Sequence, residues 1–556
     1  MIRLSDNQKI KLKTFYENKE YSNFEIEVES LGDFNDLPEF LKVGYAGSKV
    51  LNPNSKKKDY MLAVSLLDKV VKENNNKEAL YNLIAASIKS ETYHQTIPHL
   101  IEHYNLDNKD PKILEGLAKI NFDLGNIDVA IKYYSELENL NLDKTINGTR
   151  LTCLFSKNYL SEITQEKYFE ESSKIQNVFD KQSLFSTFKD INNNNKKLKV
   201  GFLSGDFKQH SVGTFFKGFI SRINKKDFNI VGFSNLGINK HDDVTKIIKS
   251  NFNEWHDILH LSDERLIDFI RSLNIDILID LSGYSLGNRI NIFAARCSPI
   301  QIIWLGYNNS TGLKNMDYIL ADFNLIKESE RHLYVEKILY LPKIWNAMEK
   351  HNNLPELVEL ADLKDNVFNF GSFNNFKKIS SETVLVWSKI LNTSNSRLFL
   401  KNSPGYNEEV INNLKSKFQK KNVDLNKIIF LKNKKTYEEH LQDYNKIDLS
   451  LDTFPYPGVT TSFESNSMGV PVLTLKGFNL NSRCGESINK NLKLEDFIAK
   501  NYDDYLNKAV LLSKKKKNTI LLRRLHRQKI MVSSLFDIDN FTIELSKILK
   551  SLKKIK

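Results

Sequence analysis

The chain has 556 residues, 41% of them hydrophobic, which is enough for several cores and predicts about three to four domains. Its formal net charge of +12 comes from lysines spread along the whole sequence, not from one basic stretch with interleaved aromatic residues, so it does not indicate nucleic-acid binding. The 3 cysteines lie far apart without a CxxC pair, which argues against a disulfide framework and a zinc site. The N-terminus lacks the apolar core of a signal peptide, and no apolar run reaches the roughly 18 residues that span a membrane. We therefore expect a cytoplasmic protein with no membrane span and no nucleic-acid partner.

The N-terminal third contains an internal repeat. Two successive 34-residue units, 77–110 and 111–144, place apolar residues at matching positions, such as Leu80 in the first and Leu114 in the second. A period of this length is typical of tetratricopeptide repeats, each of which is a pair of helices. An ordinary helical domain with a coincidental period is the alternative. Either interpretation predicts an all-α domain over residues 1–190.

The pattern changes after this domain to short apolar runs that alternate with amphipathic helical segments, in two series. Such series predict two Rossmann-like lobes of the α/β class, at 196–345 and 365–530, followed by a C-terminal helix at 531–556. Because ligands bind at the carboxyl ends of parallel strands, two facing lobes form one cleft. The predicted strands are 199–203, 230–233, 275–281, 300–304, 318–321 and 338–341 in the first lobe, and 367–370, 398–401, 428–431, 447–451 and 472–475 in the second.

The loop after the first predicted strand holds a candidate for proton transfer. His210 follows strand 199–203 by a few residues, which places it at the end of the strand where ligands bind. An imidazole titrates close to neutral pH and therefore suits general base catalysis. A histidine in a loop is more often a surface or structural residue, so this position alone does not establish a catalytic role.

The second lobe holds candidates for binding a nucleotide. Thr460 and Thr461 open a predicted helix, whose free N–H groups and hydroxyls suit a diphosphate. The alternative is a capping box, in which Glu464 stands three residues after Thr461. Lys378, after the neighbouring strand, is placed to neutralise a phosphate charge, and His440, at the start of a helix, is placed to stack on a base. The alternatives are a solvated lysine, which is common in a lysine-rich chain, and an ordinary histidine on a helix surface.

Acidic residues give little support for a metal site. The one Asp-x-Asp sequence, 537–539, precedes a terminal helix that Asp539 or Asn540 would cap. A helix N-terminus and Lys378 supply the positive charge that a metal supplies elsewhere. We therefore expect no metal and no other cofactor. The aspartates that we expect to cap strand ends are Asp276, Asp280, Asp448 and Asp452.

Ten short segments occur here in the order, and in the strand and loop contexts, of one known family. Taken together, they resemble the catalytic region of the O-linked N-acetylglucosamine transferase and SPINDLY family, over about residues 199–490. Members of that family carry tetratricopeptide arrays before the catalytic lobes, which agrees with the repeats found here. The matching segments are 204–210, 280–284, 287–289, 299–301, 304–307, 316–318, 373–375, 378–379, 451–456 and 458–461.

The resemblance implies a fold of the GT-B type and inverting, metal-independent transfer of a sugar from a nucleotide sugar. The implied donor is UDP-N-acetylglucosamine, and the implied acceptors are Ser and Thr hydroxyls of polypeptides that the repeat domain binds. Position by position, His210 matches a cleft histidine that is a proposed base, and His440 matches a histidine against the uracil. The residues that match those around the diphosphate are Asn375, Lys378, Thr460 and Thr461.

Two departures from the family pattern bear on the donor sugar. Glu464 stands where an aspartate usually contacts the ribose or sugar, and Asn309 stands where a glycine usually lets the backbone approach the sugar. UDP-glucose or GDP-fucose as the donor, or a saccharide as the acceptor, are therefore alternatives. An inactive repeat-containing scaffold is a further alternative, against which the retention of His210, Lys378 and the two threonines argues.

Overall fold

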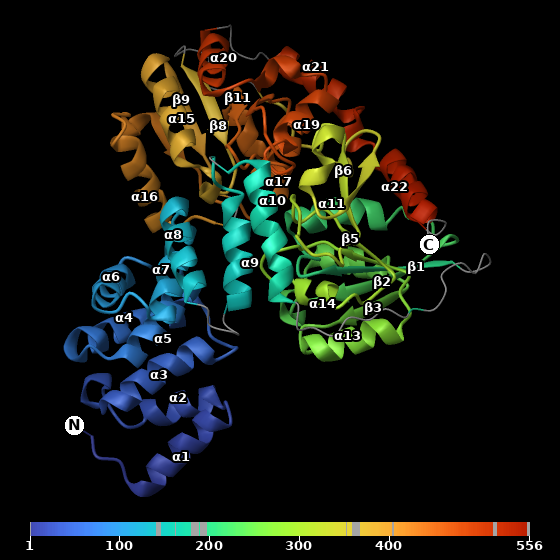
Figure 1. The fold of residues 1–556 in the computed structure, drawn as a ribbon. Helices are drawn as coiled ribbons and strands as arrows, with labels where there is room; N and C mark the ends of the chain where they lie inside the picture. The colour runs from blue at the N-terminus through green and yellow to red at the C-terminus, as the bar shows by residue number, and fades with distance from the viewer. Residues whose placement is uncertain are drawn as a thin grey trace. The chain divides into compact units, whose positions relative to one another are not determined.

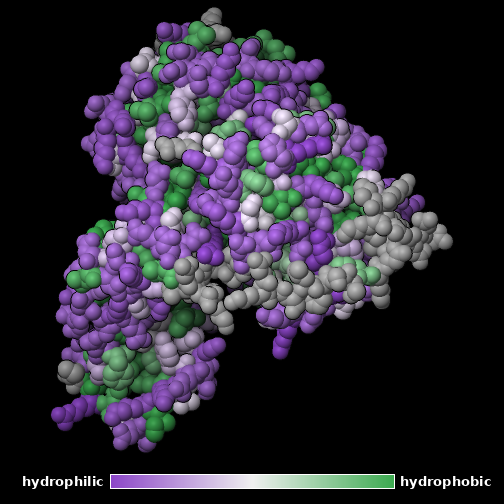
Figure 2. All heavy atoms as spheres, in the orientation of Figure 1, coloured by the Kyte–Doolittle hydropathy of each residue, from purple (hydrophilic) through white to green (hydrophobic). Residues whose placement is uncertain are grey.

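The computed structural model describes residues 2–140, 146–161, 163–179, 188, 197–351, 353–358, 367–402, 405–514 and 520–552. These form two compact units, Met1–Thr149 with Asn407–Leu414 and Arg150–Tyr406 with Lys415–Lys556 (Figure 1). The face of the molecule drawn in Figure 2 is largely hydrophilic, with small scattered patches of hydrophobic atoms. None of the helices in the described ranges is long and apolar enough to cross a membrane.

The first unit consists of successive helical pairs, and the predicted repeats fall on two of them. Helices α5 and α7 begin at Lys77 and Pro111, the first residues of the two 34-residue units. Leu80 and Leu114, which occupy equivalent positions in the repeat, are both buried. The predicted helical repeats are therefore confirmed. The helices of this unit are α1 Asp6–Glu17, α2 Tyr21–Glu29, α3 Glu39–Leu51, α4 Lys57–Asn74, α5 Lys77–Ser90, α6 Thr96–Leu106, α7 Pro111–Asp123 and α8 Ile127–Asn139.

The next helical pair belongs to the second unit, so the predicted helical domain, 1–190, extends too far. Helices α9 (Ile146–Lys157) and α10 (Gln165–Ser173) pack into the hydrophobic core of the following sheet. Tyr168 on α10 is fully buried there, and its hydroxyl bonds that of Tyr307. Apolar residues at helical spacing do not reveal which neighbouring core they join. The predicted boundaries near residues 190 and 365 lie outside the described residues.

The first lobe contains a parallel seven-stranded sheet with the order β3-β2-β1-β4-β5-β6-β7. Every strand predicted for this lobe is present. Strand β3 was not predicted because its sequence, Glu254–Asp257, is polar, as suits its place at the edge of the sheet. The elements are β1 Leu198–Ser204, α11 Ser211–Ile220, β2 Phe228–Ser234, α12 Asp243–Ser250, β3 Glu254–Asp257, α13 Asp263–Ser272, β4 Ile277–Asp280, α14 Ile290–Ala294, β5 Ile300–Ile303, β6 Tyr318–Asp322 and β7 Lys337–Leu341.

The second lobe contains a parallel six-stranded sheet with the order β10-β9-β8-β11-β12-β13. The two Rossmann-like lobes are therefore confirmed, and β13 was missed because it has only 2 residues. The elements are β8 Phe368–Ser372, α15 Ser381–Thr393, β9 Ser396–Leu400, α16 Glu408–Gln419, β10 Ile428–Phe430, α17 Tyr437–Gln442, β11 Leu449–Leu451, α18 Thr460–Ser467, β12 Val472–Leu475, α19 Cys484–Asn491, β13 Ile498–Ala499, α20 Tyr502–Lys514 and α21 Ile520–Met531.

The terminal helix α22, Ile538–Leu552, packs on the first lobe, against α11 and β7. The ring of Phe541 on α22 stacks on Trp304 of the first lobe, with centroids 6.0 Å apart. The segment that precedes α22 lies beside the segment that leaves the first lobe. The N–H of Met348 in one segment donates to the carbonyl of Leu535 in the other at 2.8 Å. Asp537, not Asp539 or Asn540, accepts the capping hydrogen bond at the start of α22.

Candidate active site

His210 lies at the N-terminus of α11, at the carboxyl end of β1. Its side chain is 45% exposed, and burial of the ring within the loop lowers the pKa of His210 below its usual 6.5. Atom Nδ1 accepts the N–H of Val212 at 3.4 Å and lies 3.6 Å from a carboxylate oxygen of Asp206. These contacts favour opposite tautomers, because the first needs a lone pair on Nδ1 and the second needs a proton there. The lowered pKa favours the neutral form of His210 at pH 7, and its exposure leaves the ring partly open to a ligand.

The N-terminus of α18 has no side-chain cap. Val459 occupies the N-cap position, so the alternative of a capping box between Thr461 and Glu464 is wrong. The Thr460 hydroxyl is buried and has no hydrogen-bond partner within the described ranges. The N–H groups of residues 459–461 likewise find no acceptor in the part of the chain that the structure describes. A helix N-terminus with unused hydrogen-bond donors is suited to bind an anion.

Asn374 and Asp452 hold this helix start in place. The hydroxyl of Thr461 donates to Oδ1 of Asn374 at 2.5 Å, and the Asn374 amide donates to Asp452 at 3.2 Å. Asp452 also accepts the N–H of Gly458 at 2.7 Å, and burial raises the pKa of Asp452 to about 6. A Cβ at position 458 would lie 2.3 Å from the Thr461 hydroxyl, so only glycine fits here. Asn374 lies in the sequence motif at 373–375, but we predicted the role beside the diphosphate for its neighbour Asn375.

Lys378 lies at the same loop. Its ammonium donates to the carbonyl of Pro457 at 2.9 Å and lies 4.0 Å from the centre of the Tyr456 ring. Burial lowers the pKa of Lys378 to about 8, although the charge of Asp452 opposes the shift. In the described parts of the chain no carboxylate lies within ion-pair distance of this ammonium, and its direct partners are a carbonyl and a ring. We call Asn374, Lys378, Thr460 and Thr461 the candidate diphosphate site.

The other predicted residues of the second lobe divide into two groups. His440 and Glu464 lie together, with Nε2 of His440 3.1 Å from a Glu464 oxygen, which also accepts the Tyr444 hydroxyl at 3.2 Å. Tyr444 in turn donates to the carbonyl of Thr461, so this pair adjoins the candidate diphosphate site. Asn375, in contrast, uses its side-chain oxygen to accept the N–H of Lys377 at the start of a short 3-10 helix.

Asn309 lies in the interior of the second unit, beside the α9–α10 pair. Its side chain is fully buried, and its amide donates to Asn158, which follows α9, at 2.9 Å. Its oxygen accepts the N–H of Ser310. Asn309 therefore joins the α9–α10 pair to the first lobe, and this position gives no support to a direct contact with the sugar.

The two lobes meet near the candidate residues of each. Phe215 on α11 packs edge-on against Phe463 on α18, with ring centroids 5.0 Å apart. His210 stands five residues before Phe215, and Thr460 stands three residues before Phe463. At 1.5 Å per residue, they lie roughly 8 Å and roughly 5 Å along their helices from one contact. The structure thus brings the first-lobe candidate and the second-lobe candidates to one junction.

Comparison with known proteins agrees with this geometry. The sequence model of glycosyl transferase family 41 matches residues 171–366 and 358–545. The chain belongs to glycosyl transferase family 41.

Relatives within family 41 include the probable UDP-N-acetylglucosamine–peptide N-acetylglucosaminyltransferase SPINDLY of Solanum lycopersicum, which is 29% identical over 427 residues, 74% of this chain and 45% of that protein. The protein named SEC of Arabidopsis thaliana is 27% identical over 353 residues, 62% of this chain and 36% of that protein. This chain thus spans less than half the length of these relatives. A mutant of the Thermobaculum terrenum O-GlcNAc transferase has the same fold, with a TM-score of 0.82 over 93% of this chain and 99% of that one at 23% identity. The GT-B fold is therefore confirmed.

The aspartates of this family 41 chain are used as strand-end caps, as predicted. Asp276 and Asp448 each accept a backbone N–H from the neighbouring strand, at 2.7 Å and 2.9 Å. Asp280 accepts two N–H groups of its own loop, and burial raises the pKa of Asp280 to about 7. Across the described residues, no group of three or more His, Cys, Asp and Glu is arranged to hold a metal ion.

A pocket of about 200 Å³ lies beside the candidate diphosphate site, at the carboxyl ends of β11, β12 and β13. Its walls come from the loops that follow these strands and from Ser161, after α9. Two residues of its lining also contact the candidate diphosphate site: the carbonyl of Pro457 accepts a hydrogen bond from Lys378, and the hydroxyl of Thr453 accepts one from the Asn374 amide.

Proposed function

We propose that this chain is an inverting glycosyltransferase that transfers N-acetylglucosamine from UDP-N-acetylglucosamine to Ser or Thr hydroxyls of polypeptides. Family membership and the names of its relatives support the donor and acceptor classes. The observation that carries the proposal is the uncapped start of α18 beside Lys378, whose ammonium has no acidic partner close enough for an ion pair in the described chain.

The candidate diphosphate site suits a leaving nucleotide. When the bond between the sugar C1 and the β-phosphate oxygen breaks, the negative charge on that oxygen increases. The N–H groups at the start of α18 and the ammonium of Lys378 stabilise this charge, and because they are held in place beforehand they need no reorganisation during the reaction. The hydroxyl of Thr460, buried and unused in the described structure, is available to donate to a phosphate oxygen. No metal is needed for this role.

His210 then serves the acceptor side. The acceptor oxygen forms its bond to C1 on the face opposite the leaving phosphate, which inverts the configuration, and its proton passes to Nε2 of His210. For this transfer Nδ1 must carry the other proton and face Asp206, 3.6 Å away, whose charge then stabilises the imidazolium. In the other tautomer, with Nδ1 accepting the Val212 N–H, Nε2 donates a hydrogen bond and only positions the acceptor.

The helical repeats of the first unit serve the polypeptide, and we propose no nucleic-acid partner. Repeats of this kind stack into extended surfaces that bind peptides. Glu464 and His440 adjoin the candidate diphosphate site, which supports a role for them in binding the ribose and the base of the donor.

The test is transfer itself. The purified chain is incubated with a panel of UDP-N-acetylglucosamine, UDP-glucose and GDP-fucose, each with an isotopically labelled sugar, and with a proteome extract. Mass spectrometry should find labelled N-acetylglucosamine on Ser or Thr, and the Lys378→Ala variant should give much less labelling under the same conditions. Transfer from another donor would correct the sugar. UDP binding without hydrolysis or transfer from any donor would identify an inactive scaffold and refute the proposal.

A further inference from the structure

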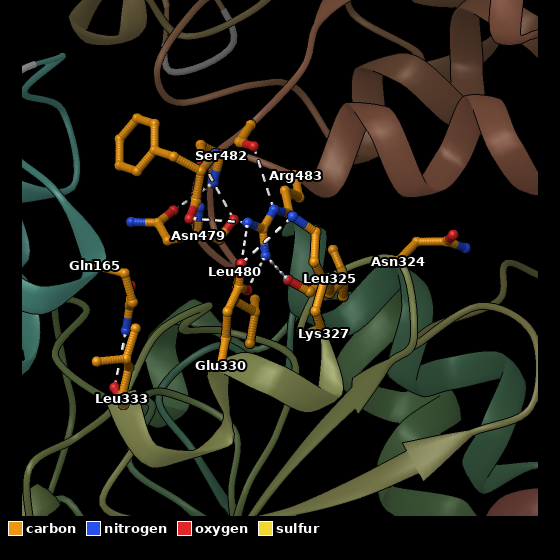
Figure 3. Close-up of polar contacts among 12 residues, drawn as sticks. Gln165, Asn324, Leu325, Lys327, Glu330, Leu333, Asn479, Leu480, Ser482 and Arg483 are labelled. Atoms are coloured by element: carbon orange, nitrogen blue, oxygen red, sulfur yellow. Dashed lines mark hydrogen bonds and ion pairs between the residues drawn. The ribbon is translucent and has the colours of Figure 1, made fainter.

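One arginine of the second lobe reaches into the first. Arg483, at the N-terminus of α19, is only 3% exposed, and its guanidinium donates five hydrogen bonds (Figure 3). Two of them form a fork onto the carboxylate of Glu330, in the 3-10 helix Glu328–Leu333 that follows β6 of the first lobe. A third goes to the carbonyl of Leu325, also in the first lobe, at 3.1 Å.

The remaining two donors of Arg483 fix its own lobe. Nε donates to the carbonyl of Gly477 at 3.2 Å, and the second terminal nitrogen donates to the carbonyl of Phe478 at 3.1 Å. The loop after β12 and the 3-10 helix after β6 are therefore bound to one rigid, planar group. A lysine has no such fork and does not reproduce this geometry.

Further hydrogen bonds surround this ion pair. Ser487 on α19 donates to Asp322 at the end of β6, at 2.7 Å, and the N–H of Leu480 donates to the hydroxyl of Tyr334 at 3.3 Å. The amide of Gln165 on α10 donates to the carbonyl of Leu333, the last residue of the 3-10 helix that holds Glu330 (Figure 3). Parts of both lobes and α10 are thus joined at one place.

Neither Arg483 nor Glu330 is a member of the candidate diphosphate site, and in the described part of the chain neither contacts His210. Every member of the candidate diphosphate site belongs to the second lobe, and His210 belongs to the first. Donor binding therefore needs the second lobe alone, whereas transfer needs the two lobes at a fixed distance and angle. We propose that Arg483 and Glu330 are a positioning pair that sets the register of the lobes, and thereby the distance from His210 to the candidate diphosphate site. This inference rests on the proposed function.

The test compares two carboxylates that each receive an arginine fork. Glu330→Gln weakens the pair across the lobes, while Asp317→Asn weakens the pair of Arg296 with Asp317, which lies within the first lobe with both side chains 19% exposed. We expect Glu330→Gln to leave the Kd for UDP within about twofold of wild type and to lower single-turnover transfer by about 10–100-fold, as misplaced reacting groups do. Asp317→Asn should leave both quantities unchanged. Equal losses in the two variants, or a parallel loss of UDP binding in Glu330→Gln, would overturn the positioning role.

Two further variants separate positioning from folding. Glu330→Asp keeps the charge and should recover part of the transfer that Glu330→Gln loses. Arg483→Lys should lose as much transfer as Glu330→Gln, and combining the two should cost little more, because both changes break one contact. Full additivity would show that the two residues act separately and would contradict the proposal.

A distance measurement makes the test independent of activity. Spin labels at Lys240→Cys in the first lobe and Lys389→Cys in the second occupy exposed sites, whereas the 3 native cysteines are buried. Pulsed electron resonance should show a broader label-to-label distribution in Glu330→Gln than in wild type or Asp317→Asn. An unchanged distribution would overturn the inference. If the wild type transfers no sugar, the proposed function fails, and this measurement alone decides whether the pair sets the register.

Discussion

Replacing Lys378 by methionine should separate two effects of its charge, one on the affinity for UDP and one on the free energy of unfolding. The side chain keeps a similar length but loses the ammonium that donates to Pro457 and lies over the Tyr456 ring. A hydrogen bond to a charged group is worth about 1.5–3 kcal/mol, so the Kd for UDP should rise by roughly 10–150-fold at pH 7. The difference in UDP affinity between the wild type and Lys378→Met should shrink above pH 8, because the pKa of Lys378 in the free protein is about 8.

The same variant should be more stable. Lowering the pKa from 10.5 to about 8 on folding means that the charged lysine opposes folding at pH 7 by at most about 3 kcal/mol. Loss of the contact with the Tyr456 ring returns about 1 kcal/mol of that, which leaves a net gain of about 2 kcal/mol for Lys378→Met. Between pH 8 and 10.5 the unfolded wild type binds more protons than the folded one, so wild-type stability rises relative to the variant in this window.

Calorimetric titration with UDP and urea unfolding, each at pH 7, 8 and 9, measure both effects. Lys377→Ala, which removes the neighbouring lysine, is the control and should change UDP affinity little. A variant that binds UDP as the wild type does, or that is less stable than the wild type at pH 7, would refute this account of Lys378.

Three other outcomes follow from the structure. His210→Ala should leave the Kd for UDP within about twofold while transfer falls by about 10²–10⁴-fold if the imidazole is a base, and wild-type transfer should fall only below its lowered pKa; a loss under about tenfold in single-turnover assays would favour the donor tautomer and mere positioning. Turnover should survive excess EDTA, and loss with recovery on adding magnesium would disprove the metal-independent account of the candidate diphosphate site. Removing residues 1–149 should spare hydrolysis of the donor and reduce protein glycosylation. Removing residues 1–185 should give insoluble protein in expression trials, because this deletion takes Tyr168 out of the core of the first lobe. A soluble, active 1–185 deletion would contradict that packing.

The order of the elements could be predicted from the sequence, because alternation of apolar strands and amphipathic helices is a local signal. Strands that lack this signal were missed, namely the polar edge strand Glu254–Asp257 and the 2-residue strand Ile498–Ala499. The boundary of the helical domain was misplaced because the helix that carries Tyr168 has the same pattern whether it packs on a repeat or on a sheet.

The candidate site was predictable only in part. Thr460 and Thr461 were found through their place after a strand and before a helix, but the choice between an open helix start and a capping box needed the backbone at Val459. Asn309 carried no signal that its amide would bind Asn158, 151 positions away. Contacts over such separations depend on how the lobes pack, which a single sequence does not encode as a local pattern.

The return of α22 to the first lobe has a mechanical consequence. The chain passes between the lobes twice, once after β7 and once before α22, and the hydrogen bond from Met348 to Leu535 places the two passages side by side. A connection made of two adjacent chain segments resists sliding and twisting of the lobes more than a single linker does. The two adjacent segments therefore favour rotation of the lobes about one axis. The ion pair of Arg483 and Glu330 then restricts that rotation.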